Sequence, residues 1–218
     1  NLIDIAGLII TEDEDPVGDV TITMDDSATR TGTKEDGRYQ FFDVSTRHAH
    51  TLTPHLDNYH KNGVSIYDVF AIQRHLDGEQ LLDSPYKLIA ADADRSGTIT
   101  SADADAVRKL VLSVTNQFSD NTSWRFVDAA YEFPDASNPW LEVFPESITY
   151  HDLHTDIIDA DFIGVKIGDV NQNAQPQEPR TEEVVEIRAE GPVFGLQTQD
   201  IELTSGDVYT IPVTAAEL

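Results

Sequence analysis

Alternating apolar and polar positions over the first fifty or so residues predict an all-β module. Four segments rich in β-branched and aromatic residues carry the pattern, and acidic or glycine-containing turns separate them: residues 3–11, 20–24, 38–42 and 50–54. In the third segment Tyr39 and Phe41 stand two positions apart, so we expect both rings on one face of the strand. The pattern predicts a β-sandwich over residues 1–55.

A helical period follows in the middle of the chain. Apolar residues recur every three or four positions over 69–76 and again over 104–112. Between these stretches, Ser84 and Pro85 precede a run of apolar residues, which is typical of the start of a short helix. The predicted fold class is mixed, mainly β, with a small α module.

A twelve-residue segment before the second helix has the spacing of a calcium-binding loop. Oxygen-bearing side chains fall at its positions 1, 3, 5, 9 and 12, and Gly97 at position 6 permits the sharp turn that such loops make. A loop followed by one helix is half of an EF-hand, and such halves usually come in pairs. The predicted calcium ligands are Asp92, Asp94, Ser96, the Thr98 carbonyl, Thr100 through a water molecule, and Asp103.

A second loop–helix unit lies upstream but keeps only the back half of the ligand pattern. Aligning Asp68 with Asp103 also aligns the turns before them and the helices after them. Tyr59 and Lys61 stand at positions 3 and 5, so this loop is degenerate. The remaining candidate ligands for a second ion are Asp57, the Gly63 carbonyl, Ser65 and Asp68.

The front half of the ligand pattern, which the upstream loop lacks, is found much later in the sequence. Asp169, Asn171 and Asn173 reproduce positions 1, 3 and 5 of a calcium loop, after which the chain reaches Pro176 and the pattern stops. We hypothesise that this front half meets the back half at Asp68 in space and completes a split second site. The alternative is an Asx-rich turn after a strand, which Asp and Asn also favour.

Paired loop–helix units of this kind resemble the dockerin family, the calcium modules of cellulosomal and bacterial surface proteins. Around the units, several segments resemble a block found in very large secreted Bacteroidetes proteins: residues 62–65, 82–87, 90–92, 121–128 and 165–171. The resemblance implies an extracellular, multidomain surface or adhesive protein, often exported by the type IX system, rather than an enzyme.

The flanking β segments carry two further resemblances. Residues 1–55 are similar to prealbumin-like sandwiches, related to carboxypeptidase regulatory domains and collagen-adhesin B repeats, which act as stalks or spacers. Strand candidates at 184–189 and 208–213 are similar to the opening strands of cohesin-like sandwiches, the structural partners of dockerins. The expected domains are a sandwich, a calcium module, a linker and a cohesin-like start: residues 1–55, 56–174, 175–182 and 183–218.

The strands after the linker are too few to hold a sandwich core alone. We expect them to belong to a longer protein. The alternative is that they complete a sheet on a neighbouring copy by strand addition, which would make the protein a filament subunit.

The formal net charge of −26, from 40 acidic and 14 basic residues, narrows the range of partners. It argues against nucleic acid and anionic membranes, and it makes divalent cations the natural counterions. Solubility or adaptation to saline water explains the charge equally well. The chain has no cysteine, which excludes disulfides and thiol chemistry, and no apolar run approaches the length of a membrane span.

Aromatic and proline residues are interspersed between 124 and 167, among them Trp124, Phe126, Trp140 and Phe144. On the surface, these rings would stack on sugars and indicate a carbohydrate-binding site. We favour the alternative that they are buried and bind the calcium module to the first sandwich.

Four histidines lie close together in the sequence, and the spacing of His48 and His50 is compatible with a zinc site that includes His55 or His60. No further ligands follow at a familiar spacing, so we favour solvent-facing histidines. The chain has no phosphate-binding glycine loop, nucleophile elbow or HExxH helix, and no carboxylate pair stands in an acid–base signature. The sequence therefore predicts no catalysis.

The sequence as a whole predicts a non-enzymatic, secreted, calcium-stabilised structural or adhesive surface protein. One alternative is a binding module whose helices dock a separate cohesin or whose aromatic stretch holds a glycan. Another is the noncatalytic region of a secreted hydrolase. Two short patterns also fit glycosylation acceptors, residues 26–28 for O-linked and residues 121–123 for N-linked glycans.

Overall fold

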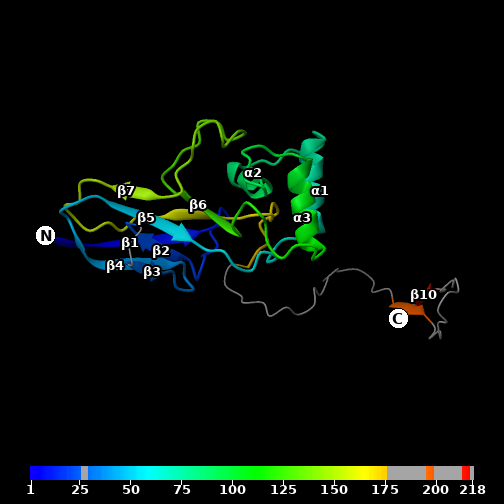
Figure 1. Ribbon diagram of the computed structural model, residues 1–218, viewed down its shortest axis with the longest axis horizontal. Coiled ribbons are helices and arrows are strands. Elements are labelled where there is room, and N and C mark those ends of the chain that lie inside the picture. The colour runs from blue at the N-terminus through cyan, green and yellow to red at the C-terminus, as the bar shows by residue number, and fades with distance from the viewer. Residues whose placement is uncertain (26–28, 176–194, 199–212, 217–218) are drawn as a thin grey trace. The chain divides into compact units, whose positions relative to one another are not determined.

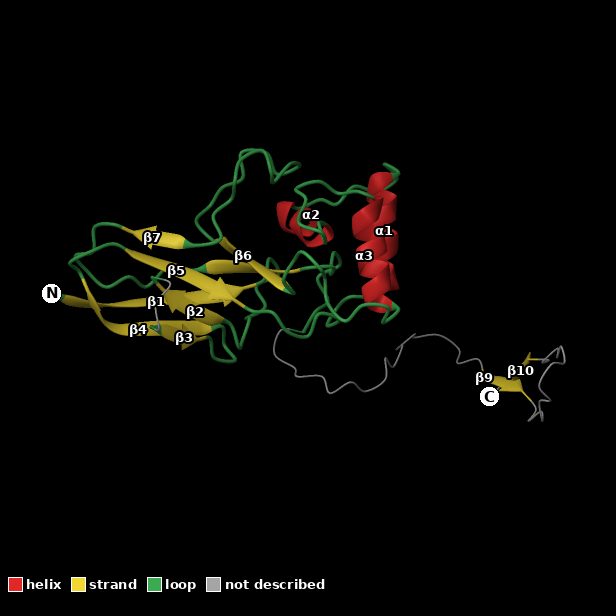
Figure 2. Cartoon of the chain, in the orientation of Figure 1, coloured by secondary structure: helices red, strands yellow, loops and turns green. Residues whose placement is uncertain are grey.

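A computed structural model describes residues 1–25, 29–175, 195–198 and 213–216. The chain divides into two compact units, Asn1–Arg180 and Thr181–Leu218. The first unit is mainly β with three short helices, which agrees with the predicted mixed class (Figures 1 and 2).

Two four-stranded sheets make up the β part of the first unit. One has the order β4-β1-β8-β6, in which β1 and β8 are parallel and the other neighbours are antiparallel. Its strands are β1 (Leu2–Ile10), β4 (Arg38–Ser45), β6 (Trp124–Asp128) and β8 (Phe162–Lys166). The other sheet is antiparallel with the order β3-β2-β5-β7. Its strands are β2 (Thr21–Met24), β3 (Arg30–Gly32), β5 (His50–His55) and β7 (Ile148–Tyr150).

The inward faces of both sheets share one hydrophobic core. Along β1 every second residue is buried, so Ile5 and Ile9 point inward while their neighbours are partly exposed. Tyr39 and Phe41 are both buried on the same face of β4, as the sequence predicted. Burial of these apolar side chains against those of the second sheet provides the main driving force for packing the two layers.

The predicted domain boundary at residue 55 does not separate the sheets. Both sheets are completed by strands from residues 124–166, a region that the sequence assigned to the calcium module. β6 and β8 are buried on both faces, so their residues do not alternate in polarity and no strand period identified them.

Three helices form beside the sheets, close to where the sequence predicted them: α1 (Ile66–Leu76), α2 (Pro85–Ala91) and α3 (Ser101–Val111). α1 and α3 begin with matching capping boxes, Ser65 with Asp68 and Thr100 with Asp103. In each box the hydroxyl and the carboxylate accept backbone N–H groups that the first turn would leave unpaired. The same residues occupy positions 9 and 12 of the two loop units.

A second hydrophobic core joins the helices to the outer faces of β6 and β8. It includes Ile72 from α1, Leu110 from α3, and Val127 and Val165 from the two strands. The aromatic residues divide between the cores. Trp124 and Phe126 lie in the first, and Phe144 lies in the second, which agrees with the prediction of buried cover.

The second unit contains an antiparallel pair, β9 (Gly195–Thr198) with β10 (Val213–Ala216). The strand candidate at 184–189 and most of the one at 208–213 lie outside the described residues, as does the predicted linker after Gln175. Within the described part of the chain, no helix has the length and apolar character that crossing a membrane requires.

Candidate metal centre

The loop between α2 and α3 gathers three carboxylates. Asp92 caps the C-terminus of α2, and Asp103 lies in the first turn of α3. Both are fully buried, and together with the partly buried Asp94 they offer carboxylate oxygens that all lie within 4.8 Å of one another. The end of α2 and the start of α3 thus bring the carboxylates at positions 1, 3 and 12 of the loop close together.

Backbone N–H groups hold the carboxylates in place. Asp92 accepts hydrogen bonds from the N–H of Ser96 at 2.9 Å and of Gly97 at 3.0 Å. Asp103 accepts from the N–H of Asp94 at 3.1 Å and of Thr100 at 2.8 Å. The loop turns around the carboxylates, with Gly97 at a φ of 77°, which is costly for residues that carry a Cβ.

The remaining predicted oxygen ligands face the same region. The Ser96 hydroxyl donates to the Thr98 carbonyl at 3.1 Å, and the Thr100 hydroxyl lies 3.2 Å from the Asp103 carboxylate. The loop therefore brings together hydroxyl, carbonyl and carboxylate oxygens, the hard donors that calcium prefers.

The three carboxylates have no cationic partner in the part of the chain that the structure describes. Among the described residues no salt bridge joins Asp92, Asp94 or Asp103 to a basic side chain. Burial raises the pKa values of Asp92 and Asp103, and repulsion between neighbouring carboxylates raises them further. A divalent cation would relieve both effects, so the donor set fits a metal ion.

The two halves of the second site meet in space. Asp68, at the start of α1, accepts hydrogen bonds from the N–H of Val170 at 3.0 Å and of Asn171 at 3.3 Å. Asp169 follows β8 and is buried, with its carboxylate turned toward its own loop. Segments more than a hundred residues apart thus form one loop-like arrangement, as hypothesised from the sequence.

This split site repeats the hydrogen bonds of the continuous loop position by position. Asp169 accepts from the N–H of Asn173 at 3.2 Å and of Ala174 at 2.7 Å, as Asp92 does from positions 5 and 6. The Asn171 side chain accepts from Asn173 at 3.2 Å, as Asp94 does from Ser96.

The closing carboxylate and the backbone match as well. Asp68 accepts from the N–H of Ser65 at 2.8 Å and from its hydroxyl at 2.9 Å, as Asp103 does from Thr100. Position 4 has a positive φ in both places, 58° at Arg95 and 59° at Gln172. An isolated Asx-rich turn accounts for the front half but not for its pairing with Asp68.

Two contacts fasten the halves to each other. The Asn62 side chain donates to the Gln175 carbonyl at 2.7 Å and accepts from the Gln175 N–H at 3.2 Å. Gly63 packs directly on Ala174, because a Cβ at Gly63 would lie 2.6 Å from the Ala174 Cα.

Asp57 does not take part in the contacts that define this site. Its carboxylate accepts the Ser123 N–H at 2.8 Å and lies 3.2 Å from His60 Nε2. Asp169 supplies position 1 instead. The sequence analysis gave both Asp57 and Asp169 as candidate ligands, and only the fold shows which of them lies at the split site.

A buried lysine stands beside the split site. Lys166 donates to the His60 carbonyl at 2.8 Å. Burial lowers its pKa to about 7, although the charges of Asp169, Asp68 and Asp57 oppose the shift. Burial also raises the pKa of Asp169 to about 6, and the nearby Asp68 adds to that shift. One lysine thus faces several acids, and the site retains an excess of negative charge.

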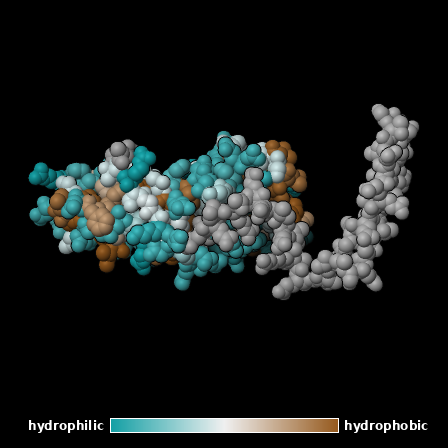
Figure 3. All heavy atoms as spheres, turned by 90° about the horizontal axis from the view of Figure 1, so that it is seen from below, coloured by the Kyte–Doolittle hydropathy of each residue, from teal (hydrophilic) through white to brown (hydrophobic). Residues whose placement is uncertain are grey.

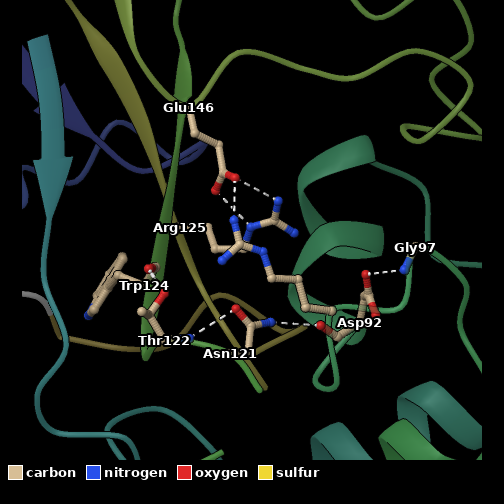
Figure 4. A network of polar contacts seen from close by, with 8 residues as sticks. Asp92, Gly97, Asn121, Thr122, Trp124, Arg125 and Glu146 are labelled. Atoms are coloured by element: carbon tan, nitrogen blue, oxygen red, sulfur yellow. Dashed lines mark hydrogen bonds and ion pairs between the residues drawn. The ribbon is translucent and has the colours of Figure 1, made fainter. Parts of the chain in front are cut away.

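Polar contacts tie the continuous loop to the sheets (Figure 4). Asn121 donates through Nδ2 to the Asp92 carbonyl at 3.0 Å. Glu146 bonds Arg95 of the loop at 2.7 Å and Arg125 of β6 at 2.8 Å. The nitrogen that an N-linked glycan would modify on Asn121 is therefore engaged in a buried contact, which disfavours that sequon. The O-linked pattern at 26–28 lies outside the described residues.

The free energy of unfolding is expected to depend on pH because burial raises the pKa values of several acids at these sites. A folded pKa above the unfolded value means that the calcium-free protein gains stability as pH falls from 7 toward 5. For Asp169, with a pKa of about 6, the gain is about 1 kcal/mol. Chemical denaturation in chelator at the two pH values measures it. Burial lowers the pKa values of His60 and Lys166, and protonating these groups opposes the gain in the same window. The comparison is therefore with Asp169→Asn, which should lose the gain from this residue. An equal gain in both proteins would contradict the assignment.

The histidines are not all solvent-facing as expected. His50 is 4% exposed, whereas His48 and His55 are exposed and His60 is partly buried beside Asp57. Asp25, which the sequence gave no reason to include, lies with His48 and His50 in a second candidate metal cluster.

Comparisons with known proteins identified no relative of this chain. No family model, no curated protein and no solved structure matches the chain.

Proposed function

We propose that this chain is a non-enzymatic, extracellular structural or adhesive protein whose fold is stabilised by calcium. The observation that carries the proposal is the repeated site. Two arrangements built from different segments share carboxylates at positions 1 and 12, backbone N–H donors to those carboxylates, and a capped helix whose first turn contains position 12. Such repetition is expected of a pair of ion sites.

Both sites join separate parts of the chain, in addition to the hydrophobic core and the polar contacts that hold those parts together. The continuous loop connects α2 to α3, and the split site connects the end of β8 to the start of α1. One ion would cross-link two helices and the other would cross-link a strand and a helix, so their effect would be on stability rather than on a reaction. The calcium is proposed to be structural.

An extracellular setting supports calcium as the ion. Extracellular modules of this type bind with dissociation constants on the order of 0.1–1 mM, so they fill outside cells and remain empty inside. The net charge of −26 opposes folding without counterions. Folding would then be favoured after export, in keeping with the dockerin-like and prealbumin-like resemblances and with secretion.

A docking role is the second candidate, and an exposed apolar surface favours it. On α1, Ile66, Tyr67 and Phe70 are 42%, 70% and 59% exposed. Leu112 and Val114, just after α3, are also exposed, and the Lys61–Ser113 contact brings the end of α3 beside the start of α1. Hydrophobic surface gathers at this helical end in Figure 3. A partner such as a cohesin-like domain would cover it.

The mass of the purified protein in solution, with calcium and then with excess chelator, tests the proposal. Native mass spectrometry should find two calcium ions per chain, and light scattering should reveal whether copies associate. Calcium-dependent polymers would favour the filament form, while a calcium-loaded monomer would favour a docking module. A protein that takes up no calcium would overturn both.

A further inference from the structure

His48, in the turn between β4 and β5, and His50, at the start of β5, lie close to Asp25, which directly follows β2. β2 and β5 are paired through Met24 and Leu52, and the Asp25 N–H bonds the Thr51 carbonyl at 2.9 Å. The ligand atoms of Asp25, His48 and His50 lie within 4.8 Å of one another. These residues belong to the β part of the chain and share none with the two oxygen-rich loops.

Both ring nitrogens of His50 face groups that only accept hydrogen bonds. Nε2 lies 2.8 Å from the Ser45 carbonyl, so this nitrogen carries a proton. Nδ1 lies 2.5 Å from an Asp25 carboxylate oxygen. Two lone pairs cannot meet at that distance, so a proton lies between them, and the two atoms must move apart for a metal ion to replace it.

The surroundings are those of a metal-binding histidine. Such residues almost always donate their other ring N–H to a carbonyl or carboxylate, which fixes the ring, and the Ser45 carbonyl plays that part for His50. The Thr51 N–H holds the second Asp25 oxygen at 2.8 Å. His48 completes the set with its ring centroid 4.3 Å from that of His50.

We propose that Asp25, His48 and His50 bind a zinc ion. Imidazole and carboxylate suit zinc, whereas calcium selects oxygen donors, so this site would not compete with the loops for the same ion. Zinc holds N and O ligands at about 2.0–2.2 Å, which places tetrahedral ligand atoms about 3.3 Å apart. The Asp25 and His50 atoms need to separate by less than about 1 Å to admit it.

Three protein ligands leave one position for water. The ion would fasten the β4–β5 turn to the end of β2 and so close this end of the second sheet. The site also explains why a polar His50 is buried there: both of its nitrogens are used, one by the fold and one by the ion.

Zinc titration of tag-free, calcium-saturated protein tests the proposal by calorimetry. We expect saturable binding of one zinc ion that displaces the proton at His50 Nδ1, and long-range nitrogen NMR of the imidazole rings should show that nitrogen shift. Loss of a direct ligand should cost at least as much as loss of a supporting group, so His48→Ala should weaken binding about 100-fold or more. His48 is exposed, so this variant should keep the fold.

His154→Ala is the matched control, since His154 is also exposed and lies outside the cluster. It should bind zinc as the unmodified protein does. Asp25→Asn should weaken binding while its side-chain oxygen can still accept from Thr51. Equal zinc affinity in the unmodified protein and in His48→Ala, or a His50 Nδ1 signal that zinc leaves unchanged, would overturn the proposal and leave a buried imidazolium–carboxylate pair.

Discussion

Removing calcium is expected to lower the melting temperature by roughly 6–20 °C relative to protein in 10 mM calcium. Dissociation constants of about 0.1–1 mM make each filled site contribute about 1.4–2.7 kcal/mol at that concentration, and two sites contribute about twice that. For a chain of this size, each kcal/mol shifts the melting temperature by about 2–4 °C. Differential scanning calorimetry in calcium and in excess chelator measures the difference.

Magnesium separates site binding from simple neutralisation of charge. At equal concentration it screens the acidic surface as calcium does, but it demands a tighter octahedral geometry and gives up its water reluctantly. If the charge of −26 reflects only solubility or saline adaptation, the two ions should stabilise equally.

A pair of variants locates the calcium effect. Asp92→Asn should lose about half of the calcium-dependent shift, because Asp92 is a buried ligand candidate of the continuous loop. Asp152→Asn changes an exposed aspartate outside the loop and should keep the full shift. An unaltered shift in Asp92→Asn would mean that calcium acts elsewhere.

The local parts of this fold were predictable because local chemistry determines them. The spacing of oxygen-bearing side chains around Gly97 lies within one short segment. The capping boxes at Ser65 and Thr100, which the structure shows, use residues that the sequence had placed at position 9 of the two loops. The alternation along β1 and the positions of α1 and α3 follow from periodicity, and Ser84 and Pro85 mark the start of α2.

The non-local parts were only partly predictable. The spacing of Asp169, Asn171 and Asn173 indicated a half-site, and the degenerate upstream loop indicated what it lacked. No local pattern placed β6 and β8 in the first sheet, because strands buried on both faces do not alternate. Asp25 was missed as a partner of His50 because only the pairing of β2 with β5 brings them together.

Gly63→Ala is expected to destabilise the calcium-bound protein by about 2–5 kcal/mol and to remove one of the two calcium ions. Gly63 has a φ of 75°, where a Cβ costs roughly 1–2 kcal/mol. The new Cβ would also lie 2.6 Å from the Ala174 Cα, and relieving such overpacking costs about 1–3 kcal/mol more. Because Ala174 belongs to the front half-site, relief of the clash must move it away from Asp68.

Gly78→Ala is the matched control for this effect. Gly78 has a φ of 71°, but a Cβ there would have no neighbour within 4 Å, so only the backbone cost of roughly 1–2 kcal/mol applies. Denaturation in calcium gives the stability difference, and calorimetric titration gives the number of ions bound. If the two halves form one site, Gly63→Ala binds one calcium ion and Gly78→Ala binds two. If Gly63→Ala still binds two ions, the junction of Gly63 with Ala174 is a packing contact alone and the halves bind independently of it.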